Sequence, residues 1–108
     1  MTRYQLHLHT RPVAGREAEY HRWYDETHIG EVIGLAGFLT GERLAPVPLA
    51  PDAPPPDSYL AVYGIETDDL PATLGQLRTA GLRLSDALDT ASVRTEVFRS
   101  LGAKASRS

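Results

Sequence analysis

A strict alternation of apolar and polar residues runs from Tyr4 to Thr10. A period of two is typical of a strand with one buried face, so this stretch predicts the first strand. Arg11-Pro12 ends it, because proline has no amide hydrogen with which to extend the ladder. One side of the strand carries Tyr4, Leu6 and Leu8, and the other side carries Gln5, His7 and His9.

From Gly15 to His28 the spacing of the aromatic residues changes to three and four. That spacing is typical of a helix that lies on a sheet and turns its charged residues to solvent. Glycines follow at Gly30, Gly34 and Gly37, so we expect the helix to end near His28 and an irregular turn to follow. The predicted buried face holds Tyr20, Trp23, Tyr24 and Thr27.

Two further strands are expected on either side of a proline-rich segment. Phe38–Leu44 predicts a strand that its central glycine weakens. Tyr59–Ile65 is continuously apolar or aromatic, which favours a central strand covered on both faces. Between them, residues 46–57 hold six of the eight prolines and predict a loop of polyproline character.

A second helix is expected after Thr67 or Asp68, either of which can cap it, with leucines at three- and four-residue intervals on its buried face. Gly81 can end this helix, although the leucines at positions 82, 84 and 88 leave a further apolar turn open. Residues 93–99 predict the last strand.

The expected order is therefore strand, helix, strand, strand, helix, strand, which is typical of the ferredoxin-like α+β fold. In that βαββαβ fold both helices lie on one face of a four-stranded antiparallel sheet. The other face must be solvated, paired with a partner or shaped into a pocket. We expect one domain over residues 1–101 and a flexible C-terminal tail over residues 102–108.

Composition narrows the classes of function. The net charge of −3 is spread without a basic stripe, so nucleic acid is not expected as a partner. The sequence shows no membrane span and no secretory signal, which favours a cytoplasmic protein. Without cysteine it has no thiolate nucleophile, disulfide or iron–sulfur cluster, and its only lysine lies in the tail.

His28 is the leading candidate for acid–base chemistry, because a neutral imidazole exchanges a proton near pH 7 with little change of pKa. The alternative is a histidine that interacts with free carbonyls at a helix C-terminus. Asp25 either orients His28, as a carboxylate does in catalytic pairs, or is an exposed helix charge. Tyr63 is the candidate donor to a developing enolate oxygen.

Several other residues are candidates for substrate binding. Tyr59 and Tyr63 share a strand face with Ala61 between them, which leaves room for a flat ligand. Arg43 and Arg94 can bind a carboxylate or phenolate, although a surface position is favoured for both. The remaining candidates are Trp23 and Tyr24 as aromatic walls, and His7 and His9 either in the pocket or at a wet dimer interface.

A metal site is the less favoured reading of the same helix. His21, Asp25 and His28 are spaced by four and three residues, as the ligands of a divalent cation on one helix face would be. Histidine and acidic residues are common on helix surfaces, and no second cluster of ligands is evident. We therefore expect no metal.

The segment Tyr20-x-x-Trp23-Tyr24-Asp25-Glu26-x-His28-Ile29, with Gly37-Phe38 opening a strand, resembles the dimeric α/β-barrel superfamily, in particular its EthD-like branch. That superfamily includes antibiotic-biosynthesis monooxygenases, polyketide cyclases, muconolactone isomerase and stress-responsive proteins. The resemblance covers roughly residues 1–45 by motif and extends to Ser100 by element order. It implies a homodimer that packs sheet to sheet, with a pocket between the sheet and the first helix into which His28 points.

These observations lead to the expectation of an enzyme without a cofactor that acts on a small aromatic or polyketide-like molecule. Cyclisation, isomerisation or dehydration fits a histidine base and a tyrosine donor. Cofactor-free monooxygenation of a phenol is one alternative, and a non-catalytic ligand-binding or stress-response barrel is another. A haem-binding barrel with His28 or His7 as the iron ligand also stays open.

Overall fold

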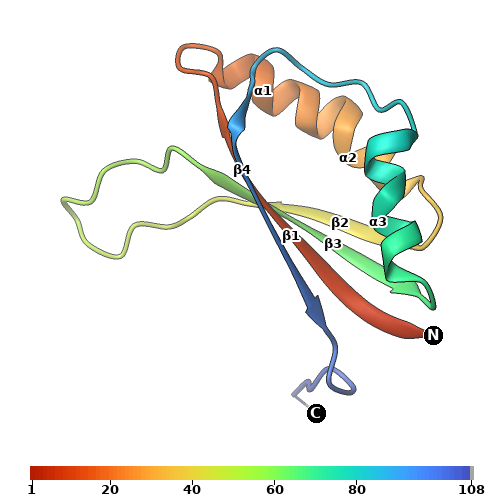
Figure 1. Cartoon of the computed structure of the whole chain (residues 1–108). Coiled ribbons are helices and arrows are strands. Elements are labelled where there is room, and N and C mark those ends of the chain that lie inside the picture. The colour runs from red at the N-terminus through yellow and green to blue at the C-terminus, as the bar shows by residue number, and fades with distance from the viewer. Residues whose placement is uncertain (108) are drawn as a thin grey trace.

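The computed structural model describes residues 1–107, which form a sheet and the helices that cover one of its faces (Figure 1). The strands are β1 (Thr2–Pro12), β2 (Phe38–Leu44), β3 (Tyr59–Thr67) and β4 (Leu88–Arg99). The helices are α1 (Glu17–Trp23), the π-helical turn η1 (Tyr24–His28), α2 (Ile29–Ile33) and α3 (Leu70–Thr79). No helix in this range is long and apolar enough to cross a lipid bilayer.

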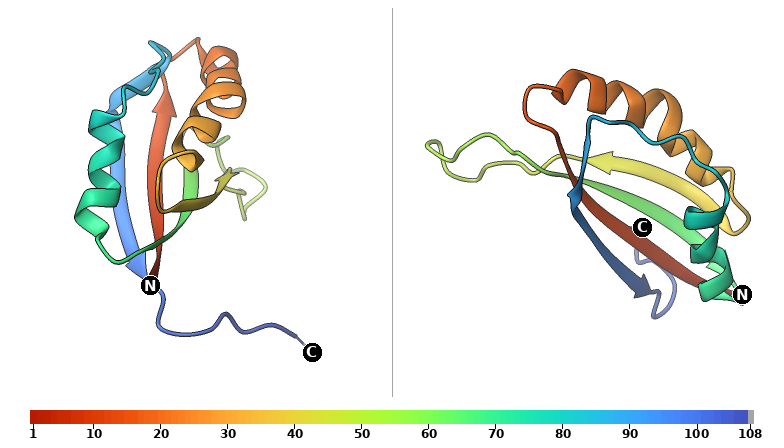
Figure 2. Two further views of the ribbon diagram at one scale, coloured as in Figure 1. Left: turned by 90° about the vertical axis from the view of Figure 1, so that its right-hand side faces the viewer. Right: turned by 45° about the horizontal axis from the view of Figure 1, so that its top comes forward.

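The strands of residues 1–107 pair antiparallel in the order β2-β3-β1-β4. Strands β1 and β3 are therefore central, and β2 and β4 are the edges. This arrangement is the ferredoxin-like α+β fold, so the predicted fold class is confirmed. Figure 2 shows the helices gathered on one face, which we call the inner face; the opposite, outer face has no layer of described residues over it.

The first helix continues past His28, where the sequence predicts its end, and runs without interruption through Ile33. A glycine inside a helix costs only about 1 kcal/mol relative to alanine, so Gly30 does not stop it. Burial of Val32 against the sheet favours the extra turn. The helix ends at Gly34, and Gly37, with a φ of 86°, supplies the left-handed turn into β2.

The π-helical turn determines which side chains of this helix meet the sheet. The buried positions are four residues apart, whereas Trp23 and Thr27, predicted for the same face, are only half-buried. In an ideal α-helix, each four-residue step rotates about 40° beyond a full turn, so such a stripe drifts off the sheet. The wider π turn reduces that drift. The buried stripe is Tyr20, Tyr24, His28 and Val32.

The second helix begins differently from the prediction and ends as predicted. Asp69, rather than Thr67 or Asp68, caps α3, and its carboxylate accepts a hydrogen bond from the amide of Ala72 at 3.1 Å. Ala80 is the C-cap, and Gly81 follows it with a left-handed φ of 69°, which confirms that this glycine ends the helix. Residues 82–87 then cross to β4 without a further helical turn.

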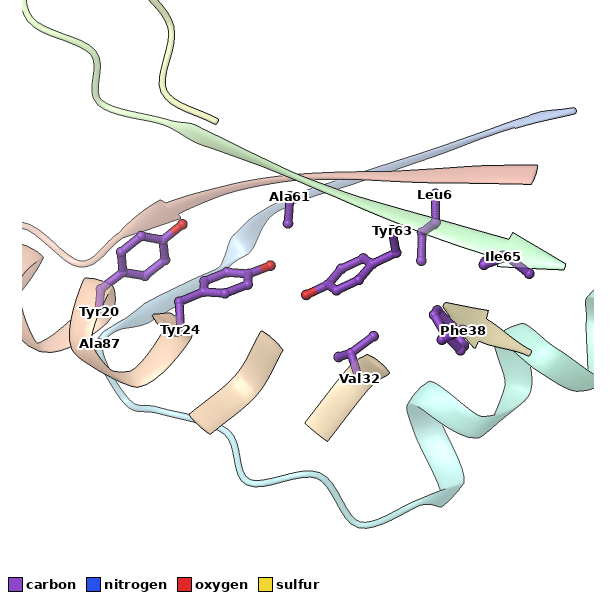
Figure 3. Close-up of a cluster of buried hydrophobic side chains, with 9 residues drawn as sticks. All are labelled: Leu6, Tyr20, Tyr24, Val32, Phe38, Ala61, Tyr63, Ile65 and Ala87. Carbon is purple, nitrogen blue, oxygen red and sulfur yellow. The ribbon is translucent and has the colours of Figure 1, made fainter. Parts of the chain in front are cut away.

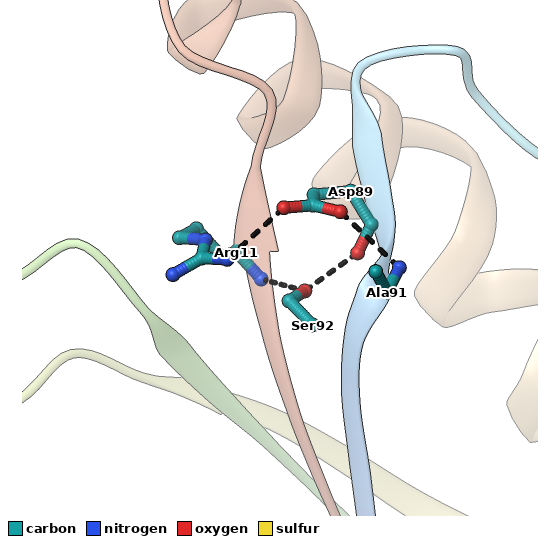
Figure 4. A network of polar contacts seen from close by, with 4 residues as sticks. All are labelled: Arg11, Asp89, Ala91 and Ser92. Carbon is teal, nitrogen blue, oxygen red and sulfur yellow. Dashed lines mark hydrogen bonds and ion pairs between the residues drawn. The ribbon is translucent and has the colours of Figure 1, made fainter.

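Strand β4 starts at Leu88, five residues before the predicted start, because side chains bridge an interruption in its pairing with β1 (Figure 4). The amide of Arg11 donates to Ser92 Oγ at 2.9 Å, and the Ser92 hydroxyl donates to the Asp89 carbonyl at 2.6 Å. The Arg11 guanidinium also pairs with the Asp89 carboxylate at 3.1 Å. Side-chain oxygens thus replace ladder acceptors at the bulge, so the strand lacks a simple alternation there.

The core between the first helix and the sheet is aromatic (Figure 3). Tyr20, Tyr24 and Tyr63 are almost completely buried. The Tyr20 hydroxyl is hydrogen-bonded to that of Thr10. Ala61 is also buried, and the rings of Tyr20 and Tyr24 lie below it in Figure 3. The space that the sequence suggests for a flat ligand over Ala61 is therefore filled by the protein itself.

Two segments lie outside this core. Residues 45–58 contain no helix or strand and extend beyond the end of the sheet (Figure 1). Their apolar side chains Val47 and Leu49 are 76% and 98% exposed. Residues 100–107 also form no regular element, and Ser108, the last residue of the predicted flexible tail, lies outside the described residues.

Gly41 explains how α2 can lie close to β2, and its replacement gives a test of that packing. A Cβ atom there would lie 2.9 Å from Ile29 Cγ1 and 3.0 Å from Ile33 Cγ2. Gly41→Ala should lower the free energy of unfolding by about 1–3 kcal/mol, measured by chemical denaturation. The control Gly75→Ala, on α3 with nothing within 4 Å, should raise it by about 0.5–1 kcal/mol. Equal stability of Gly41→Ala and the wild type would contradict this account.

Candidate functional site

His28 is the last residue of the π-helical turn, and the turn places its ring between the helix and the sheet. The ring stacks on that of Trp23 with centroids 4.5 Å apart and meets the Tyr24 ring edge-on at 5.1 Å. Its Nδ1 atom is buried and has no hydrogen-bond partner among the described residues. Burial lowers the pKa of His28, so the imidazole is neutral at pH 7.

Tyr63, on the inner face of β3, has the second unpartnered polar atom of this core. Its hydroxyl is buried without a hydrogen bond of ordinary length within residues 1–107, although the Tyr24 hydroxyl is near enough to lower the pKa of Tyr63. Figure 3 shows the hydroxyls of Tyr63 and Tyr24 pointing toward one another. Burial raises the pKa of Tyr63 to about 12 and also raises that of Tyr24. Both phenols therefore keep their protons at neutral pH and remain able to donate.

Tyr24 connects these groups, since its ring contacts His28 and its hydroxyl points at Tyr63. A buried polar atom without a partner costs about 1–3 kcal/mol. Two such atoms on either side of one tyrosine are a cost that packing alone does not explain. The pair His28 and Tyr63 is therefore the candidate site; both residues lie in the packed core and line none of the cavities described at the surface of residues 1–107.

A hydrogen bond to the segment after α3 holds the Trp23 ring, which covers His28. Its Nε1 donates to the carbonyl of Arg83 at 2.8 Å. Arg83 in turn forms an ion pair with Glu31 at 3.0 Å, and this hydrogen bond lowers the pKa of Glu31. The segment after α3 thus closes over the helix beside the candidate site.

A polar cluster around Arg43 lies next to Tyr24. The guanidinium sits 4.6 Å from the centroid of the Tyr24 ring, a cation–π contact. It donates to Asp25 Oδ1 at 2.8 Å and is hydrogen-bonded to His21 Nδ1 at 2.9 Å. Burial, and then the charge of Arg43, lower the pKa of His21. The prediction that Arg43 is a surface residue is therefore wrong, because its side chain is only 15% exposed.

The ion pair with Arg43 decides between the alternatives for Asp25 and favours an exposed helix charge. Asp25 does not orient His28, because its carboxylate pairs with Arg43 and leaves His28 Nδ1 without a partner. The proposed metal face of His21, Asp25 and His28 does not form either, since Arg43 engages the first two. Among residues 1–107 no group of three histidine or acidic side chains is placed to hold a metal ion.

Three of the candidates for substrate binding lie on the outer face, which excludes the pocket alternative for His7 and His9 and agrees with the surface position favoured for Arg94. His7 is hydrogen-bonded to Gln5 at 3.1 Å and packs against Phe98, and His9 pairs with Glu96 at 2.9 Å. Arg94 is exposed opposite His9 in the β1–β4 pairing. The sheet separates them from His28, because side chains alternate between the two faces. Tyr59 lies on the inner face, 4.6 Å from the His21 ring.

The sequence pattern favours a surface position for Arg43 because it does not show that β2 is irregular. Strict alternation from Phe38 would turn Arg43 away from the helices. The pairing of β2 with β3 shifts between Phe38 and Thr40, and this bulge turns Arg43 to the inner face, opposite Ala61. Gly41 is the available signal, since a glycine within a strand often marks a bulge.

This geometry defines the class of protein by its fold: the chain is a ferredoxin-like α+β domain with an aromatic inner face. No family model and no curated protein matches the chain. Among solved structures, a protein of Shewanella loihica PV-4 described as a "putative monooxygenase" is similar, with a TM-score of 0.57. The similarity covers 95% of this chain and 99% of that one at 14% sequence identity, so it supports the fold alone.

The lowered pKa of His28 gives a prediction about stability. An unfolded histidine binds a proton below about pH 6.5, whereas the buried ring resists it. The wild-type free energy of unfolding should therefore fall as the pH drops below 6.5, and it should be insensitive to His28 above that value.

His28→Phe keeps the stacked ring and removes the titrating group, so it should lose part of this pH dependence. Denaturation curves at pH 7.5 and pH 5.5 measure the difference. His21→Gln should remove a further part, because the pKa of His21 is also lowered. An identical fall in stability for His28→Phe and the wild type would contradict the assignment.

Proposed function

We propose that this protein is an enzyme that transfers a proton on a small aromatic or polyketide-like molecule, and that it belongs to the EthD-like branch of the dimeric α/β-barrel superfamily. The supporting observation is the pair of buried, unpartnered polar atoms on His28 and Tyr63. Buried titratable groups of this kind concentrate at functional sites.

The two groups have complementary roles. Neutral His28 accepts a proton from the carbon beside a substrate carbonyl, since its lowered pKa keeps a lone pair available at pH 7. Tyr63, with its raised pKa, donates a hydrogen bond to the enolate oxygen that forms. In an isomerisation the proton then returns to another carbon. In a cyclisation the enolate carbon bonds to a second carbonyl carbon of the same molecule, and the alkoxide that forms takes the proton from His28. In a dehydration a hydroxyl group leaves and takes the proton as water. Residues 1–107 supply both groups, so this chemistry requires no cofactor.

Cofactor-free monooxygenation of a phenol is the second candidate, favoured by the name of the similar Shewanella loihica protein. It begins with the same step, because His28 would remove the phenolic proton and leave an electron-rich phenolate. Dioxygen would then place one oxygen atom in a quinone product and release the other as water, and the substrate would supply the electrons. Oxygen uptake distinguishes this reaction from the first candidate.

Three matched substitutions test the proposed site. His28→Phe and Tyr63→Phe each remove one unpartnered polar atom and keep a ring, so stability should hold or rise while turnover falls by about 10²-fold or more. Tyr20→Phe is the control, since it breaks the hydrogen bond to Thr10. It should lower the free energy of unfolding by about 1 kcal/mol and spare turnover.

The assay uses a panel of phenols and 1,3-diketones, with product detection by mass spectrometry and oxygen uptake measured in parallel. Turnover that survives both His28→Phe and Tyr63→Phe would exclude this site. A protein that binds members of the panel and converts none would favour the ligand-binding alternative instead.

The outer face supports a homodimer. It presents Val62 at the centre of the sheet and Phe98, which is 48% exposed, on β4. Pairing with a second copy is the simplest way to bury such a surface in a chain of this size. Light scattering should give twice the 11.8 kDa mass of one chain.

Val62→Glu should reduce that mass to one chain, because it buries a charge at the proposed interface. Val47→Glu introduces the same side chain on the exposed loop and should leave the mass unchanged. A single-chain mass for the wild type at micromolar concentration would rule the dimer out.

A further inference from the structure

A cavity of about 330 Å³ opens beside Arg43, near the base of the proline-rich loop. Neither His28 nor Tyr63 lines it, so it is separate from the proposed catalytic pair. Its volume lies at the small end of the range for ligand sites, which suits a molecule with a single ring. The lining residues are His21, Asp25, Arg43, Leu44, Ala45 and Tyr59.

Arg43 is the fixed element of this cavity. Its guanidinium lies over the Tyr24 ring and is hydrogen-bonded to His21, and its side chain is 15% exposed. The protein core therefore sets the orientation of the Arg43 guanidinium group before any ligand binds. Little side-chain freedom remains to be lost on binding, and preorganisation of this kind favours affinity.

The partner of Arg43 on the solvent side is much less constrained. Asp25 pairs with the guanidinium at 2.8 Å, but the aspartate side chain is 61% exposed on the helix surface. An ion pair with one partner in solvent is weak and exchanges readily. Asp25 thus holds the position that the carboxylate of a ligand would take.

The other walls indicate what the rest of such a ligand must be. The half-buried Tyr59 lines the cavity, and its ring stands edge-on to that of His21 with centroids 4.6 Å apart. Because His21 Nδ1 accepts a hydrogen bond from Arg43, the ring hydrogen of a neutral His21 is on Nε2. Aromatic walls beside a guanidinium favour a flat ring that carries an anionic group.

We propose that this cavity binds a small aromatic carboxylate, whose carboxylate replaces Asp25 on Arg43 and whose ring packs against Tyr59. The inference goes beyond the proposed reaction and does not depend on it, since the residues that carry it do not include His28 or Tyr63.

The test titrates the full chain with benzoate and with benzamide, which has the same shape without the charge. Benzoate should bind at least about fivefold more tightly, because only a carboxylate completes the pair with Arg43. Asp25→Asn removes the competing carboxylate and should raise benzoate affinity by about 3–10-fold. Glu26→Gln, one residue further along the helix, makes the same change in net charge and should have little effect.

Arg43→Gln should reduce benzoate affinity at least about tenfold. If that variant does not fold, the comparison of Asp25→Asn with Glu26→Gln decides the question alone. Equal binding of benzoate and benzamide, equal affinities for the Asp25 and Glu26 variants, or no binding of benzoate at about 10 mM would each overturn the proposal. His28→Phe should retain benzoate binding, which separates this test from that of the reaction.

Discussion

The four-residue spacing of buried side chains along the first helix is the constraint on which the rest of the structure depends. It is incompatible with a long, straight α-helix on a sheet, and the π-helical turn is the local solution. The turn brings the His28 ring inward, where burial deprives Nδ1 of water and of a partner. The same geometry leaves the Tyr24 ring in contact with both His28 of the candidate site and Arg43, which lines the cavity near the proline-rich loop.

Much of the fold is predictable from local patterns. The period-two alternation locates β1, the continuous apolar run locates β3, and the order of elements defines the fold class. The errors occur where a side chain or a neighbouring element overrides the local signal. Gly30 resembles a helix end in sequence, but packing of the next turn on the sheet carries the helix past it. The start of β4 depends on contacts of Arg11 with Asp89 and Ser92, which no local pattern contains.

The sequence predicts which residues form the candidate site better than it predicts which side chains pair with one another there. The rings of Trp23, Tyr24 and His28 contact one another, and the Tyr24 hydroxyl points at that of Tyr63. The sequence leaves open whether Asp25 orients His28 or is an exposed helix charge. The outcome depends on Arg43, which a bulge in a strand distant in sequence turns toward Asp25. The alternation of β1 already separates His7 and His9 from Leu6. Only the placement of the helices shows that this separation puts both histidines on the outer face.

Trp23 is the only tryptophan of the chain, and its indole lies directly on the His28 ring. Protonated imidazole quenches indole emission by electron transfer, whereas neutral imidazole does so far less. The intrinsic fluorescence of the protein is therefore an optical signal from inside the site. It should respond to the charge on His28 without any label, and also to movement of the Arg83 segment whose carbonyl accepts the indole hydrogen bond. A stopped-flow fluorimeter can thus follow protonation of His28 and movement of the Arg83 segment in real time.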